Sequence, residues 1–535
     1  MNLAAIGKPY IPAWKDLSPF AAECWLIATL TAILITPFFA RRRNHACFIV
    51  SLIGLIVSLI ALLWKGPTSA TAATGLPLHG ILISDSFSML WKAMLLVFTI
   101  GILFLWRSTA AADMQEGDGP EFFTLLIGAT LGMCLMASTT NLLMIFLAIE
   151  LASFPSYVLA GFRKTHRVGA EASLKYVLFG AAASAIMVYG LTFLYGLYGT
   201  LEIAEIARQM NTGAAPHPAL LTIALFGLIV GVGFKIAAVP FHFWCPDVFE
   251  GASIEVSAFL SVASKGAGLV LLLRVLMTFA DAAGYQQGQP LTALAIAVGM
   301  IGAITATVGN TAAFAQNNIK RLLAYSSIAH AGYMLCAISL LFALNAKPTD
   351  GSGINIPAQA LLLYLAVYLF MNLGAFAVAG LVHRATGSED ISAFNGLVQR
   401  HPILAHSMLA CMISLIGLPP FAGFIAKLTV LRILMDNGGW WWLLVAAIAI
   451  NSIASAFYYF RVLRAMYLQP ADQPAFVGHP LGVALSVVSA VALFLMLILA
   501  GPLNNLTKHY SKLQGITGHP TPATESTITA SLKTP

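Results

Sequence analysis

Long apolar segments of about 20 residues recur along the whole chain, separated by short polar stretches. A helix needs about 20 apolar residues to cross a bilayer, and lipid admits only helices or closed barrels because backbone polar groups must be satisfied internally. Runs this long and uniform predict an all-α integral membrane protein with about 14 transmembrane helices. The expected centres lie near residues 28, 55, 96, 130, 150, 185, 231, 266, 300, 330, 369, 418, 451 and 490.

The seventh and twelfth segments are long and interrupted by proline, in "FKIAAVPFHFW" and "SLIGLPPFAGFIAKLTV". Pro240, and Pro419 with Pro420, remove backbone donors and leave carbonyls without helical partners, which a membrane tolerates only against protein or water. The two interrupted segments are five spans apart, so the units that contain them are expected to have opposite orientations. This pattern predicts two inverted five-helix repeats with broken helices 7 and 12, an arrangement typical of transport sites near the midplane.

These boundaries divide the chain into five expected parts. They are three N-terminal helices (1–120), a first antiporter-like repeat of helices 4–8 (121–280), a second, inverted repeat of helices 9–13 (281–470), a last transmembrane helix (471–502) and a disordered, Thr/Ser/Pro-rich polar tail (503–535).

Composition and charge agree with a membrane protein. The chain is 59% hydrophobic and 9% charged, whereas soluble domains carry roughly 25% charged residues. Basic clusters at 41–43, 163–167, 320–321 and 461–464 fall on one side of a fourteen-span bundle. The positive-inside rule makes that side cytoplasmic and places both termini outside. The net charge of +7 reflects these loops, so we expect no nucleic-acid partner.

Familiar cofactor motifs are missing from the sequence. The six cysteines are scattered without a CxxC pair, and no Walker loop or HExxH pattern occurs. We therefore expect neither an iron–sulfur cluster, a nucleotide site nor a metal site in this chain.

Charged residues inside the apolar spans are the candidate functional groups. Lys235, Lys265 and Lys427 lie deep in spans seven, eight and twelve, and Glu150 lies at the centre of span five. A central charge costs roughly 2.5–3.5 kcal/mol on insertion scales, so several in one bundle indicate compensation and a function. Burial disfavours the charged form of an amine and a nearby carboxylate favours it, so a Glu150–Lys235 interaction could load and release a proton. A purely structural ion-pair network is the alternative for all four residues.

Lys175 and His330 are two further candidates for a proton role, and the sequence indicates that role less strongly for them. Lys175 lies near the inner end of span six, where it could serve a proton path or extend its ammonium to the interface. His330 lies within span ten beside Ser326, Ser327 and Tyr325, where a proton role and a hydrogen-bonded core histidine are both open.

Several motifs together resemble a known family. They are "DSFSMLWKAMLLVFT" from Asp85, "LLMIFLAIELASFPSYVLAGF" in span five, "EASLKYVLFGAAASAIMVYG" in span six, "FKIAAVPFHFWCPDVFEG" in span seven, "NIKRLLAYSSIAHAGYML" in span ten and "GLPPFAGFIAKL" in span twelve. From about residue 85 to 470 the chain resembles the antiporter-like membrane subunits of proton-pumping NADH:quinone oxidoreductase, respiratory complex I. The lysine in "SVASKGAG" is similar to the subunit N branch, whereas subunits L and M and Mrp-type antiporters tend to have histidine there.

The resemblance implies specific roles. Glu150 would tune Lys235, Lys265 would pass the proton along a central hydrophilic axis, Lys427 would end that axis, and Lys175 matches a span-six lysine of this branch. It also implies that NADH, FMN, iron–sulfur clusters and quinone belong to partner subunits and not to this chain. The expected neighbours are subunits M and K, in the lipid of a bacterial inner membrane.

The sequence departs from the family at one place and leaves two other functions open. The family usually has "EGAPTPV" where this chain has "EGASIEV", which puts Glu255 near the inner end of span eight and bears on the loop geometry and the proton entry route. The open alternatives are an Mrp-type Na⁺/H⁺ antiporter subunit and a non-conducting membrane scaffold.

Overall fold

The computed structural model describes residues 14–66, 81–109, 118–163, 167–212, 217–282, 289–341 and 355–511. Within these ranges the regular structure is helical, apart from isolated backbone bridges between loops.

The helices of the N-terminal half follow one another with short connections. They are α1 (Trp14–Leu17), η2 (Ser18–Phe20), α2 (Ala21–Ile35), η3 (Thr36–Phe38), α3 (Arg43–Lys65), α4 (Ser86–Thr109), α5 (Asp118–Met136), α6 (Leu142–Ala160), α7 (Arg167–Tyr198), α8 (Ile203–Thr212), α9 (Pro218–Ile236), α10 (Trp244–Gly251), α11 (Ile254–Phe259), the π-helical turn η5 (Leu260–Ser264) and α12 (Lys265–Ala282).

The C-terminal half continues in the same way. Its helices are α13 (Gln289–Ala313), α14 (Ile319–Ser339), α16 (Asn355–Thr386), η6 (Ile391–Phe394), α17 (Leu397–Arg400), α18 (Pro402–Ile416), α19 (Gly423–Asn437), α20 (Trp441–Leu468), α21 (Pro480–Ile498) and α22 (Ala500–Tyr510).

The described residues contain 13 helices long and apolar enough to span a membrane. The shorter apolar helix α18 and its continuation α19 supply one more, which agrees with the expected 14. The predicted breaks are confirmed: α9 ends at Ile236 before α10 begins at Trp244, and α18 ends at Ile416 before α19 begins at Gly423. Left-handed residues end both first halves, Ala237 with φ 61° and Gly417 with φ 89°. The inverted relation between the two five-helix units stays a prediction.

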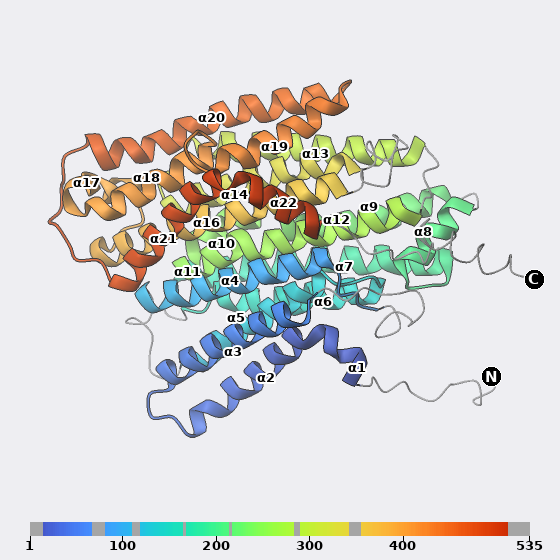
Figure 1. The fold of residues 1–535 in the computed structure, drawn as a ribbon, viewed down its shortest axis with the longest axis horizontal. Coiled ribbons are helices and arrows are strands. Elements are labelled where there is room, and N and C mark those ends of the chain that lie inside the picture. The colour runs from blue at the N-terminus through green and yellow to red at the C-terminus, as the bar shows by residue number, and fades with distance from the viewer. Residues whose placement is uncertain are drawn as a thin grey trace, which may run out of the picture.

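The helices lie side by side, and the chain crosses the bundle from one edge to the other (Figure 1). The hairpin of α2 and α3 forms one edge and α20 the opposite one, with α6, α9, α12 and α14 between them. Helix α21 returns across the bundle and packs on α16 and α4. The helices with the candidate residues are therefore in the interior.

Small residues let the interior helices approach closely. A Cβ added at Gly132 of α5 would lie 2.5 Å from the backbone nitrogen of Ala152 in α6, and one at Gly309 of α13 would lie 2.6 Å from that of Ala329 in α14. Lipid offers no hydrophobic drive for helix association, so such close contacts supply much of the attraction. They fix α6 and α14, the two helices that carry Glu150 and His330.

A buried ion pair joins α4 to α12. Asp85, directly before α4, accepts a hydrogen bond from Arg274 of α12 at 2.7 Å, and both side chains are fully buried. The same carboxylate accepts from the backbone N–H of Ser88 at 2.9 Å and so caps the first turn of α4. The pair therefore fixes the position of α12 along its axis relative to α4.

The expected boundary of the polar tail is too early. Residues 503–510 were expected to be disordered, but they continue α22, which packs against α16. Gln359 of α16 donates to Asn504 at 2.7 Å, and Thr507 is buried. These polar contacts hold a segment whose composition alone indicates disorder. Residues 512–535 lie outside the described ranges.

Replacing Asp85 by Asn is expected to destabilise the protein, because it leaves the Arg274 charge buried without a counter-charge. Loss of one partner of a buried pair commonly costs about 3–5 kcal/mol. The thermal unfolding midpoint of the purified protein measures the effect. Arg432→Met is the control, since its ion pair with Asp436 is 3.9 Å long and largely exposed. Equal midpoints for Asp85→Asn and the control would contradict this role.

Candidate functional site

Lys235 lies in the last turn of α9, directly before the helix break, and its side chain is fully buried. The turn is closed by backbone hydrogen bonds from Ala237 and Ala238 back into α9. The Lys235 Nζ donates to the Ser153 Oγ of α6 at 3.0 Å. The break thus places the ammonium against α6, where a hydroxyl meets it.

Glu150 lies one helical turn before Ser153 on α6, and Ser184 of α7 donates a hydrogen bond to its carboxylate. Among the described residues no ion pair joins Glu150 to Lys235, although the two charges interact electrostatically. The expected interaction between Glu150 and Lys235 is therefore electrostatic and acts over a longer distance than a direct ion pair. The direct hydrogen-bond partner of the Lys235 amine is Ser153, which lies one turn after Glu150 on α6.

Lys265 begins α12 and is almost fully buried. Its Nζ donates to the Ser327 hydroxyl of α14 and lies 5.4 Å from the centre of the Phe249 ring. The preceding turn η5 is π-helical, a distortion that occurs frequently at functional sites. One turn further along α12, a Cβ added at Gly268 would lie 3.4 Å from the Lys235 Cβ, so the segment next to Lys265 packs directly on Lys235.

His330 follows Ser327 by one turn on α14 and is buried. Its Nδ1 is 2.7 Å from the hydroxyl of Tyr364 on α16. The charges of both Lys265 and Lys427 act on the imidazole. Its environment therefore combines a hydrogen bond with the electrostatic influence of both lysines.

Lys427 lies in the first turns of α19 and is buried. Its Nζ donates at 2.7 Å to the backbone carbonyl of Ile416, the last residue of α18. It also lies 5.0 Å from the ring centre of Tyr333 on α14. The carbonyl that the second break leaves without a helical partner is thus satisfied by the lysine.

These groups form one polar line through the bundle, which we call the lysine line. It consists of Glu150, Ser153, Lys235, Lys265, Ser327, His330 and Lys427. Its residues come from α6, α9, α12, α14 and α19, in that order along the chain. A chain of amines, hydroxyls and an imidazole can exchange protons without a metal or redox group.

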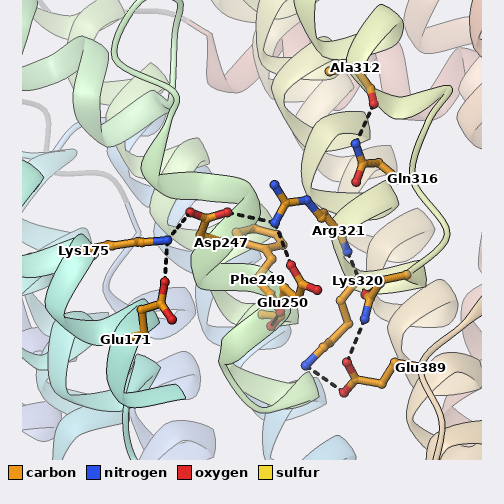
Figure 2. A network of polar contacts seen from close by, with 12 residues as sticks. Glu171, Lys175, Asp247, Phe249, Glu250, Ala312, Gln316, Lys320, Arg321 and Glu389 are labelled. Atoms are coloured by element: carbon orange, nitrogen blue, oxygen red, sulfur yellow. Dashed lines mark hydrogen bonds and ion pairs between the residues drawn. The ribbon is translucent and has the colours of Figure 1, made fainter. Parts of the chain in front are cut away.

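Lys175 lies apart from the lysine line. Its side chain is 40% exposed and pairs with Glu171 and Asp247, each at 2.8 Å. Figure 2 shows that Asp247 also binds Arg321, which in turn reaches Glu250. The structure therefore places Lys175 in an ion-pair network at the end of the bundle that carries the basic loops.

Sequence reasoning missed two kinds of partner. Ser153 and Ser327 bind the buried lysines, but serines are common in the spans and their contacts depend on tertiary packing. A second buried pair, Glu23 with Lys92 at 2.5 Å, joins α2 to α4. Lys92 is a lysine inside an apolar run, so the signal that identified the other lysines was present there as well.

Comparison with known proteins identifies the family. Residues 139–453 match the family model described as NADH:quinone oxidoreductase/Mrp antiporter, transmembrane. NADH-quinone oxidoreductase subunit N of Anaeromyxobacter sp. (strain Fw109-5) is 38% identical over 458 residues, which cover 82% of this chain and 85% of that protein.

Solved structures agree in fold. A chain of respiratory complex I from Thermus thermophilus superposes with a TM-score of 0.72 at 31% identity, covering 91% of this chain and 99% of the other. A chain of the Mrp complex from Dietzia sp. DQ12-45-1b has a TM-score of 0.75 at 19% identity, covering 94% and 98%, which shows the shared fold alone. By the family match over residues 139–453 and the 38% identity to a subunit N, this chain belongs to the subunit N family of NADH-quinone oxidoreductases.

Proposed function

We propose that this chain carries protons across the membrane as one subunit of a NADH:quinone oxidoreductase, through the lysine line. The observation that supports it most is the succession of three buried lysines, each hydrogen-bonded to an uncharged oxygen, from α9 to α19. Ionisable groups inside a membrane bundle are costly to bury and commonly mark ion pathways or proton relays. The relative from Anaeromyxobacter, named for the same subunit, supports the enzyme class.

Each transfer along the line is a proton exchange between neighbouring groups. A protonated lysine gives one proton to a water or hydroxyl beside it and becomes a neutral amine, and the next amine takes up a proton and becomes charged. Because burial disfavours ammonium and a carboxylate favours it, movement of the Glu150 charge relative to Lys235 biases that exchange. Coupling then requires only that partner subunits shift this electrostatic balance.

We infer that the redox chemistry belongs to partner subunits that hold NADH, FMN, iron–sulfur clusters and quinone, and that this chain has no redox group of its own. Subunits M and K are the proposed neighbours in a bacterial inner membrane. The basic loops at one end of the bundle favour that end as cytoplasmic, which puts both termini on the outer side.

A Na⁺/H⁺ antiporter subunit of the Mrp type is the second candidate, since the matched family and the shared fold both include such proteins. Vesicles that contain the purified protein distinguish the two. Proton movement driven by a sodium gradient, without NADH oxidation, would favour the antiporter. A pure scaffold is the third candidate, and under it neutral substitutions in the lysine line should impair assembly and leave turnover per assembled complex intact.

Lys235→Met is expected to abolish most coupled activity in complexes that still assemble. Positioned proton-transfer groups commonly contribute about 10²–10⁴-fold, so NADH-driven quinone reduction and proton uptake should both fall about tenfold or more. Both rates are measured on membranes whose assembly is verified by native gel electrophoresis. Lys65→Met, at an exposed helix end, is the control and should leave both rates unchanged. Wild-type rates in assembled Lys235→Met would refute the proposal.

Glu150→Gln keeps the shape of the side chain and the Ser184 contact but removes the negative charge near Lys235. We expect normal assembly with slower proton uptake, because the amine then lacks the charge that favours its protonated form. Ser153→Ala removes the direct hydrogen bond to the Lys235 amine and leaves the Glu150 charge in place, so it tests separately whether the position of that amine matters. Full pumping in Glu150→Gln would show that this carboxylate does not control Lys235.

A further inference from the structure

Glu255 is a buried carboxylate that the lysine line does not use. It lies in α11 at 1% exposure, and neither carboxylate oxygen has a hydrogen-bond partner among the described residues. Buried polar groups in native proteins are nearly always bonded, so an unpartnered carboxylate calls for a reason.

A cavity of about 200 Å³ adjoins Glu255 at the basic end of the bundle, lined also by Thr109, Arg163, His383 and Arg384. A second cavity of about 330 Å³ shares Arg163 and His383 with it. Arg384, which lines the first cavity, is exposed at the protein surface. Polar cavities of this size hold water, which brings the aqueous phase to the carboxylate.

Among the described residues no ion pair joins Glu255 to a cation, although Arg163 and Arg384 line the cavity beside it. The buried cation Lys320 is also within electrostatic reach of Glu255. Lys320 already pairs with Glu389 at 2.8 Å and donates to the Ala252 carbonyl at 2.7 Å, and Figure 2 shows it turned toward Glu389. The Lys320 charge is thus compensated without Glu255.

Buried hydroxyl groups lie along the helical segment between Glu255 and Lys265, where Ser257 and Ser261 donate to backbone carbonyls, so water must complete any proton path between the two charged residues. Ser257, Ser261 and Ser264 are buried among the nine residues between Glu255 and Lys265, which are ten positions apart in the same continuous span. A helical rise of about 1.5 Å per residue makes this separation roughly 15 Å, too far for a direct transfer and suitable for a short chain of water and hydroxyls. The π-helical turn within this segment frees backbone groups from regular pairing.

We propose that Glu255 is the proton-uptake group of this chain, which loads the Lys265 part of the lysine line from the basic side; the inference rests on the proposed function. A hydronium ion in the cavity gives its proton to a Glu255 carboxylate oxygen and leaves water. The resulting carboxylic acid then releases the proton into the hydroxyl and water chain, a neutral Lys265 amine accepts a proton at the other end, and Glu255 returns to carboxylate.

The test compares Glu255→Gln with wild type in membrane vesicles that contain the whole assembled complex. In Glu255→Gln the rate of NADH-driven proton uptake should fall about tenfold. This is less than the contribution typical of positioned proton-transfer groups, because water can partly replace a group at the entry of the path. Glu255→Asp, which keeps a carboxylate, should recover most of the rate. Asp472→Asn, an exposed carboxylate at the same end of the bundle, should have no effect.

Infrared difference spectra during turnover give a readout that a structural role would not move. The wild type should show the C=O band of a carboxylic acid appearing and decaying, and Glu255→Gln should lack it. Wild-type uptake together with an unchanged spectrum in Glu255→Gln would overturn the inference.

Two further variants keep the outcome decisive. If Glu255→Gln does not assemble, Thr109→Phe fills the cavity and leaves the carboxylate in place, and wild-type uptake in that variant overturns the inference. If Lys235→Met abolishes uptake while Glu255→Gln does not, only the entry group is wrong. If neither variant changes uptake, the proposed function itself fails.

Discussion

A lysine ammonium placed among apolar helices must meet hydrogen-bond acceptors, because otherwise the transfer from water is too unfavourable for the charge to persist. In this chain the three lysines of the lysine line each meet an uncharged oxygen: a serine hydroxyl for Lys235 and Lys265, and a helix-end carbonyl for Lys427. Such acceptors stabilise the charge only weakly compared with a carboxylate. The amines can therefore exchange protons, whereas Arg274, paired with the carboxylate of Asp85, holds its helix in place.

The broken helices and the close helix contacts serve this requirement together. The first break ends α9 directly after Lys235, and the second provides the carbonyl that Lys427 binds. Small residues such as Gly132 and Gly309 bring neighbouring helices near enough for single hydrogen bonds to connect them. The same architecture thus gives a rigid frame and a polar interior. Membership in the subunit N family agrees with both properties.

Much of this arrangement could be predicted from sequence, because hydrophobic length reveals spans and charges inside them are conspicuous. The number of spans, both breaks and the burial of Lys235, Lys265 and Lys427 are confirmed. The serine partners could not be predicted, since their role arises only when distant helices pack. The surroundings of Lys175 could not be predicted for the same reason. Its partner Asp247 is 72 residues away in the sequence, and their contact places Lys175 in the ion-pair network at the end of the bundle. The helical start of the tail depends on contacts with α16 that composition does not encode.

The most direct test of the central claim is a high-resolution cryo-electron microscopy map of the assembled membrane complex, with ordered water resolved around the lysine line. The account predicts water or hydroxyl density that links Lys235 to Lys265, and Lys265 through His330 to Lys427, at hydrogen-bond distances. A dry, apolar gap between any two of these groups, present in every resolved state of the turning-over enzyme, would contradict it.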